Sequence, residues 1–323
     1  MVYVYVSAAL AALAVLVAGW YLASCRAKRS MVGEHVVVTG GSQGLGLALA
    51  VACVRRGANV TIIARNAAAL DAALTACSAE AAPGARALAA AGDVTNELSV
   101  LQAVKLGEAS FGPVDVLIAC AGCATTGMFL DLDDATFVKQ TDLNYLGVVR
   151  SVRAVAGGMV ARGSGRLVLV SSGLALCGYA GYAAYAPTKW AVRGLCEVLR
   201  SELGPRGVAV HSVYPPNMDT PGFAVENRSK PAATKAIEEG EPTHDPAAIA
   251  RSILASVDAG DYQICCGDFG ISLLARAANG LAPRTTLAFD VCALPLIAII
   301  GAVYRRVWEH TVRRSYASMK QDS

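Results

Sequence analysis

The chain has 323 residues, a length that suits one large α/β domain with appended segments better than two full domains. Hydrophobic residues make up 54% of it and charged residues only 16%, and with a mean hydropathy of +0.45 this composition predicts membrane segments. A net charge of +3, without a long Lys/Arg run interleaved with aromatic residues, argues against nucleic-acid binding.

The first segment, residues 1–25, carries no charge and is long enough to cross a membrane as a helix. Arg26, Lys28 and Arg29 follow it, so the positive-inside rule places the next domain in the cytosol. We therefore predict a retained transmembrane anchor. A cleavable signal peptide is the alternative, and the absence of a basic residue before the apolar run argues against it.

Strand and helix patterns alternate from His35 onward. Strands are predicted at 36–38, 59–64, 86–93, 114–119, 166–171 and 208–214. Helices are predicted between them, up to 56 and at 66–78, 97–111, 134–160 and 187–203. This alternation is typical of a Rossmann-like, doubly wound parallel sheet with helices on both faces. We assign it to a catalytic domain at 33–267.

The rhythm breaks at residues 215–243, which contain five prolines and several glutamates with little periodicity. A segment of this length without its own elements is usually a lid, a binding loop or disordered, and we predict a substrate loop here. A capped helix at 245–258 and a last strand at 262–266 should follow.

The C-terminal region begins with an amphipathic stretch at 271–282 and continues with an apolar stretch at 287–303 that contains Asp290 and Pro295. The apolar stretch only marginally spans a bilayer, and an aspartate is costly at its centre. We predict a membrane-associated helical segment at 268–304, as a re-entrant hairpin or an interfacial helix, followed by a basic tail at 305–323. A core helix of the globular domain is the alternative.

Glycines mark the turn between the first predicted strand and helix. Gly40 permits a tight turn, and Gly44 and Gly46 allow a pyrophosphate to approach the backbone at the helix N-terminus. Ser42 and Gln43 complete this turn. Because the turn follows a strand and opens a helix, it predicts a dinucleotide site rather than a merely flexible connection.

The end of the second strand indicates which cofactor is bound. Sites that prefer NAD place an acid there for the ribose hydroxyls, whereas this chain has Arg65-Asn66. The Arg65 guanidinium can pair with a 2′-phosphate, and Ser42 offers a nearby hydroxyl. We therefore predict NADPH, and hence reduction; a merely solvated arginine is the alternative.

Tyr185 and Lys189 are four residues apart, which places them on one face of a helix. If that face lines a cleft, the ammonium ion stabilises the phenolate and lowers the tyrosine pKa from about 10. The tyrosine would then protonate a ketone oxygen near neutral pH. The alternative is a chance pair on a solvated helix, and other residues of the chain must distinguish the two interpretations.

Several motifs together resemble the short-chain dehydrogenase/reductase family. Residues 39–46 are similar to its T-G-x-x-x-G-x-G turn, Ser172 lies thirteen positions before Tyr185, and Asn144 lies in the expected Asn-Tyr-Leu-Gly. One departure is that the family's Asn-Asn-Ala-Gly reads Ala-Cys-Ala-Gly at 119–122, which removes asparagine hydrogen bonds that support the strand.

The resemblance implies a role for each matching residue. Tyr185 would donate the proton, and Lys189 would lower its pKa and hold the nicotinamide ribose. Ser172 would hydrogen-bond the carbonyl, and Asn144 would anchor a water in the proton relay. Asp93-Val94, at the end of the third strand, would contact the adenine.

The stretches 114–122, 144–147 and 214–228 resemble one branch of the family, the 3-ketodihydrosphingosine reductases. This implies reduction of 3-ketosphinganine, a long-chain amino ketone, to sphinganine on the cytosolic face of the endoplasmic reticulum membrane. A membrane-bound reductase of a steroid or retinoid ketone is the first alternative. A non-catalytic membrane scaffold is the second, although it predicts a damaged Tyr/Lys/Ser set. The sequence leaves assembly as a homo-oligomer open.

Substrate contacts are less well defined. Met218, Phe223 and the stretch 271–282 would give a lipid apolar access. We expect the glutamates of the 215–243 segment to form a solvated acidic loop, and the alternative is that one of them pairs with the substrate amine: Glu226, Glu238, Glu239 or Glu241.

The ten cysteines are scattered, which fits a reducing, cytosol-facing domain. Cys120 and Cys123 form a Cys-x-x-Cys pair, but no histidine or second pair accompanies them. We predict no metal site, and a redox role for this pair is a minor alternative.

Overall fold

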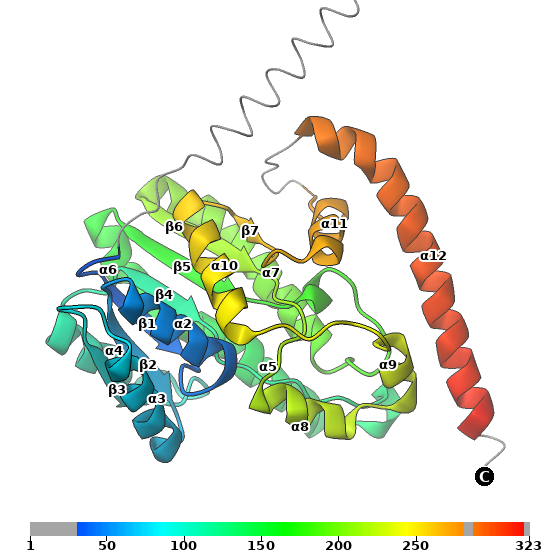
Figure 1. The fold of residues 1–323 in the computed structure, drawn as a ribbon, viewed down its shortest axis with the longest axis horizontal. Helices are drawn as coiled ribbons and strands as arrows, with labels where there is room; N and C mark the ends of the chain where they lie inside the picture. The colour runs from blue at the N-terminus through cyan, green and yellow to red at the C-terminus, as the bar shows by residue number, and fades with distance from the viewer. Residues whose placement is uncertain (1–30, 281–286, 320–323) are drawn as a thin grey trace, which may run out of the picture.

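The computed structural model describes residues 31–280 and 287–319. Its centre is a seven-stranded parallel sheet with the order β3-β2-β1-β4-β5-β6-β7 (Figure 1). The strands are β1 His35–Thr39, β2 Asn59–Ala64, β3 Ala87–Ala91, β4 Val116–Ala119, β5 Gly165–Val170, β6 Val208–Val213 and β7 Gln263–Ile264. The strand order reverses between β1 and β4, and ligands bind at the carboxyl ends of strands beside such a switch point.

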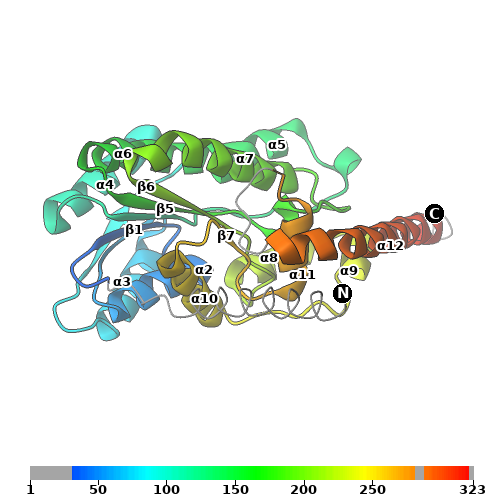
Figure 2. The same cartoon turned by 90° about the horizontal axis from the view of Figure 1, so that it is seen from above.

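Helices cover both faces of the sheet, as Figure 2 shows. One layer contains α2 Gly44–Arg55, α3 Ala67–Ala79 and α10 Pro246–Ala259. The other contains α4 Glu97–Phe111, α6 Gly147–Arg162 and α7 Ala186–Leu203. Side chains alternate along β1, so Val36 and Val38 enter one core and Val37 the other. This explains why the strands are continuously apolar, and the predicted doubly wound fold is confirmed.

The helix predicted at 134–160 is the main error within the sheet domain. The structure divides it into α5 Asp134–Thr141, a π-helical turn Asp142–Leu146 and α6. Asn144 lies in the wide turn and is fully buried, with its amide bonded to neighbouring groups. Hydrophobic periodicity does not reveal such a turn, which commonly marks a functional site.

The segment at 215–243 contains two short helices, α8 Pro221–Ser229 and α9 Ala232–Ile237. Thr220 caps α8, since its hydroxyl accepts the Phe223 N–H at 3.1 Å. Our expectation of an irregular segment is therefore wrong. The helices were missed because neither is long enough to show a clear apolar face, and their sequence is rich in proline.

Beyond β7, α11 Phe269–Ala277 lies on the far side of the domain boundary that we placed at residue 267. It nevertheless packs onto the catalytic domain, because Ile271 and Leu274 contact a small core that includes Ala175 and Tyr214. This packing places α11 within the body of the domain. Its amphipathic sequence reflects that contact.

The last helix, α12 Leu287–Met319, runs alongside α11 and α9 and projects beyond the sheet (Figures 1 and 2). It continues through the boundary expected at residue 304, so the basic residues Arg305 and Arg306 lie within a helix rather than in a separate tail. No helix in the described part of the chain has both the length and the apolarity to cross a membrane. The anchor predicted at residues 1–25 lies outside the described residues.

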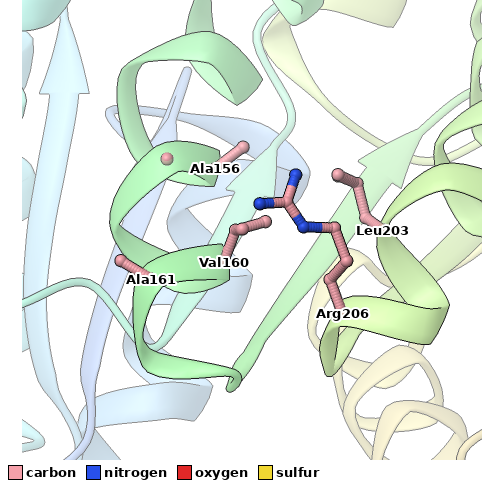
Figure 3. A pocket seen from close by; sticks show the side chains of 6 residues that line it. Ala156, Val160, Ala161, Leu203 and Arg206 are labelled. Carbon is pink, nitrogen blue, oxygen red and sulfur yellow. The ribbon is translucent and has the colours of Figure 1, made fainter.

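A pocket of about 360 Å³ lies between the ends of α6 and α7 (Figure 3). It is lined by Ala156, Gly157, Val160, Ala161, Leu203 and Arg206. These residues precede β5 and β6, so the pocket is at the amino edge of the sheet. The glycine turn and the Tyr185 cluster are at the opposite edge.

Candidate active site

The turn after β1 can follow its tight path only because it is built from glycine. Gly40 has φ +68°, and its N–H donates to the Ile63 carbonyl at 2.8 Å. A Cβ on Gly40 would lie 2.7 Å from Ala121 Cα, and one on Gly46 would lie 2.2 Å from the Gly40 carbonyl oxygen. Both distances are too short for any side chain. The turn is a cradle of backbone atoms, as the sequence predicted.

The start of α2 lies open above this cradle. Gln43 occupies the N-cap position, but its exposed side chain makes no capping bond, and Ser42 is half-buried beside it. The first N–H groups of α2 can therefore bind a pyrophosphate. A Cβ on Gly44 would lie 3.2 Å from Thr220 Cγ2, so the cap of α8 packs over the same turn. Sequence reasoning missed Thr220, which is 176 residues away with no motif to link it.

Arg65 lies directly after β2, with its side chain 65% exposed and its Nη1 3.9 Å from Asp93 Oδ2. Burial raises the pKa of Asp93, but hydrogen bonds from Thr95 and the charge of Arg65 outweigh it and leave the pKa below its usual value. Asn66 caps α3 by accepting the Ala69 N–H at 2.9 Å. The Arg65 guanidinium is therefore largely exposed, whereas the Asn66 side chain has a structural role.

Val94 lies at the next position along this edge of the sheet. It is 5% exposed, and its carbonyl accepts a hydrogen bond from Arg150 at 3.2 Å. A Cβ on Gly147 would lie 2.9 Å from Val94 Cγ2, so α6 packs tightly against this side chain. The packing fixes Val94 beside Asp93, where an adenine contact was expected.

The residues expected to be catalytic converge at the carboxyl ends of β4 and β5. Ser172 follows β5 and accepts the Leu174 N–H at 3.2 Å, which orients its hydroxyl. Tyr185 precedes α7, and the Ser172 hydroxyl interacts with its phenol. Lys189 is 4% exposed, and its Nζ donates to the Val170 carbonyl at 3.1 Å. The structure therefore brings all three predicted side chains together.

The pKa values in this site differ from the expectation. Burial raises the pKa of Tyr185, the charge of Glu226 raises it further, and the Ser172 hydroxyl acts in the opposite direction. Burial also lowers the pKa of Lys189 to about 8. The Lys189 Nζ is 5.7 Å from the centroid of the Tyr185 ring. The net shift of the Tyr185 pKa is upward, opposite to the lowering predicted from Lys189, because desolvation of the phenolate is its largest cause.

Asn144 holds the loop that follows β4. Its Oδ1 accepts the Cys123 N–H at 3.0 Å, and its Nδ2 donates to the Cys123 carbonyl and to Gln140 Oε1, each at 3.0 Å. A Cβ on Gly122 would lie 2.8 Å from Asn144 Oδ1 and 3.3 Å from Lys189 Nζ. Because Gly122 has no side chain, the Asn144 amide and the Lys189 ammonium group can approach each other. The retained Ala-Gly motif did not by itself predict this role.

The Cys120 and Cys123 thiols are both free. Burial raises the pKa of Cys120 to about 11, which keeps its thiol protonated and unreactive near neutral pH. Among the described residues, no group of three or more histidine, cysteine or acidic side chains is arranged to hold a metal ion. The pair contributes backbone to the site, through the hydrogen bonds of Cys123 to Asn144.

The glutamates of α8 and α9 are not a solvated loop. Lys230 is 5% exposed, and its Nζ is 3.2 Å from Glu226 Oε1 and 2.6 Å from Glu238 Oε2. The Tyr182 hydroxyl is 2.6 Å from Glu226 Oε1 and 2.7 Å from Glu238 Oε1, and Tyr179 donates to Glu238 at 2.9 Å. Glu239 and Glu241 are exposed, as expected. The Glu226/Lys230 spacing of four residues was a signal that sequence reasoning did not use.

Apolar side chains border this ionic cluster. The Lys230 Nζ lies 4.3 Å from the centroid of the Phe223 ring, and Met218 packs against the core beneath α10. Ile271 of α11 lies against Gly173, next to Ser172. Trp308 of α12 contacts Tyr179, with ring centroids 5.2 Å apart. Of the side chains predicted to give a lipid access, Ile271 therefore lies next to Ser172 and Phe223 lies at the ionic cluster.

The fold is that of a nicotinamide-dependent oxidoreductase, with Ser172, Tyr185 and Lys189 gathered beside the glycine turn. A family model described as short chain dehydrogenase matches residues 34–231, and the chain belongs to this family. The solved alcohol dehydrogenase from the archaeon Thermococcus sibiricus, complexed with 5-hydroxy-NADP, is similar with a TM-score of 0.60 and 27% identity. That similarity covers 69% of this chain and 90% of the archaeal one.

Within the family, the chain is similar to reductases of a sphingoid ketone. It is 37% identical to the 3-ketodihydrosphingosine reductase of Bos taurus over 290 residues, which cover 88% of this chain and 87% of the relative. It is 35% identical to the 3-dehydrosphinganine reductase of Danio rerio, over 90% of this chain and 88% of the relative. The resemblance stated from the sequence is confirmed.

Proposed function

We propose that the chain reduces 3-ketosphinganine (3-dehydrosphinganine) to sphinganine in sphingolipid synthesis, with NADPH as the reductant. The observation that carries the proposal is the joining of Ser172, Tyr185 and Lys189 beside the glycine turn, in a chain that matches the named reductases over most of its length. An intact set of this kind also argues against a non-catalytic scaffold.

Bound NADPH would supply the hydride that attacks the ketone carbon. Ser172 donates a hydrogen bond to the ketone oxygen, and Tyr185 gives that oxygen its proton as negative charge develops on it. Lys189 offers an ammonium group to the nicotinamide ribose. Asn144 fixes the loop after β4, which lies against Lys189. Burial of Tyr185 keeps the phenol protonated before the reaction, which a proton donor requires.

Arg65 supports the choice of NADPH. Its guanidinium lies exposed at the end of β2, at the position where an acid would repel a 2′-phosphate. Asp93, 3.9 Å away, balances its charge without forming a close bond. An arginine so weakly held can reorient to the phosphate at little cost.

We also propose that the enzyme works at the endoplasmic reticulum membrane with its catalytic domain facing the cytosol. The apolar residues 1–25 followed by Arg26, Lys28 and Arg29 support an anchor of this orientation. On α12, the exposed apolar residues Leu296, Ile299, Val303 and Val307 support a further contact with lipid. A long-chain ketone partitions into the bilayer, so an enzyme held there meets it at high local concentration.

The test is NADPH consumption by membranes containing the full chain, with 3-ketosphinganine or a steroid ketone as substrate. We expect turnover of the sphingoid ketone and little of the steroid. The reverse preference would overturn the assignment, as would a lack of NADPH oxidation with both ketones. Membranes without the chain give the background rate.

A further inference from the structure

The ionic cluster of α8 and α9 carries an excess of negative charge in a largely buried place. The Glu226 and Glu238 side chains are 16% and 9% exposed, and the Lys230 side chain between them is 2% exposed. Two carboxylates against one ammonium group leave one negative charge uncompensated. The charge of Glu238 is felt by Glu241, since burial and then that charge raise the pKa of Glu241. A buried excess of this kind favours a further cation.

The cluster lies next to the catalytic phenol. The Tyr182 hydroxyl lies within hydrogen-bond distance of both carboxylates, and the Tyr182 ring centroid is 6.1 Å from that of Tyr185. Thr126, on the loop after β4, reaches the Glu226 carbonyl at 3.4 Å and Ser229 Oγ at 2.8 Å, which ties α8 to the same site. Among the described residues, no side chain or N–H donates to Glu226 Oε2.

The proposed substrate has a complementary arrangement of groups. Its amine is on the carbon next to the ketone carbon, so an ammonium ion must lie close to the ketone oxygen that Tyr185 protonates. Among the cluster carboxylates, Glu226 is the one whose charge acts directly on Tyr185. Resting on the proposed function, we infer that Glu226 binds the substrate ammonium group and thereby selects 2-amino ketones over other long-chain ketones.

This contact would couple recognition to proton transfer. The charge of Glu226 raises the pKa of Tyr185, which makes the phenol a weaker acid. An ammonium ion placed against Glu226 offsets that charge and restores acidity to the phenol. A ketone without the amine leaves the excess negative charge of the cluster in place, so it binds less well and also meets a poorer proton donor.

The main experiment compares Glu226→Gln with the wild-type enzyme on two substrates, 3-ketosphinganine and the same ketone without its amino group. We expect the preference for the amino ketone, measured as the ratio of kcat/KM values, to fall by about 10- to 100-fold in the variant, as for loss of a charged hydrogen bond. A wild-type ratio retained in Glu226→Gln would overturn the inference, as would an equal loss on both substrates.

Glu239→Gln is the matched control, since Glu239 is an exposed carboxylate on the same segment. Its ratio should stay within about twofold of the wild-type value, as for most surface substitutions. If wild type reduces neither ketone, the proposed function itself fails. If it prefers the amino ketone and Glu226→Gln keeps that preference, only the present inference fails.

A second measurement needs no variant. Hexadecylamine should compete with 3-ketosphinganine for the wild-type enzyme in detergent, and hexadecanol at the same concentration should compete about tenfold less, because only the amine carries the charge. Equal inhibition by the two would contradict amine recognition even if Glu226→Gln did not fold.

Discussion

The two halves of the site, on either side of the strand-order switch, are built in different ways. The predicted cofactor half is made mostly of backbone, a glycine turn after β1 and the open start of α2, to which Arg65 at the end of β2 adds a side chain. The substrate half is made of side chains from segments far apart in sequence, joined by Lys230 and Tyr182. Backbone binds what all substrates share, whereas side-chain charges distinguish one substrate from another.

This comparison predicts that changes in the cofactor half affect every substrate alike. The largest such effect should come from Tyr185→Phe at the junction of the halves. Loss of the proton donor should lower kcat by about 10²- to 10⁴-fold on any ketone, while NADPH still binds. Stopped-flow turnover with a fluorescence titration of NADPH measures both, and retained turnover would show that another group donates the proton.

Gly46→Ala should come next, because the new Cβ would lie 2.2 Å from the Gly40 carbonyl oxygen, which cannot move away. We expect loss of NADPH binding and a decrease of about 1–3 kcal/mol in the free energy of unfolding. Gly194→Ala is the control, since a Cβ there meets nothing within 4 Å. Equal NADPH affinity in the two variants would contradict the cradle.

Lys189 provides a pH test of burial at the junction. Its pKa is about 8 when folded and about 10.4 when unfolded, so between these values the unfolded chain binds more protons and stability rises with pH. Lys189→Met has no ionisable group at this position, so its stability lacks this dependence on pH. The free energy of unfolding of wild type, taken relative to that of Lys189→Met, should therefore rise by about 2 kcal/mol between pH 8 and pH 10.

Urea unfolding of the full chain in detergent at the two pH values measures this change. Taking the difference between variant and wild type removes the titration of cysteines and tyrosines that both proteins share. A difference that does not vary with pH would mean that Lys189 titrates normally in the folded protein.

The smallest effect is expected from Arg65→Ala, because that side chain is largely exposed. NADPH affinity should fall about tenfold and NADH affinity should not change, so the preference between the two cofactors decreases. Arg55→Ala is a suitable control, since Arg55 is also exposed and pairs with Glu80 on α3's C-cap. An equal loss for both cofactors would argue against a 2′-phosphate contact.

Sequence reasoning succeeded where local patterns decide structure. The strand at Asn59–Ala64 and the helix at Glu97–Phe111 have the predicted bounds, because apolar periodicity and the cap at Asn96 depend only on neighbouring residues. It failed at the π-helical turn around Asn144, where the buried amide is held by Cys123 and Gln140. Helical periodicity does not show that Asn144 will bond to a loop that lies 21 residues earlier in the chain.

By itself, the sequence determined the doubly wound sheet, the glycine turn and the identities of Ser172, Tyr185 and Lys189, since these follow from periodicity and from short motifs. Only the tertiary structure decided the state of their charges. Glu226 looked like a solvated acid and is instead paired with Lys230 beside the catalytic phenol. The physical reason is that a charge is set by what surrounds it, and here those neighbours come from segments that only folding brings together.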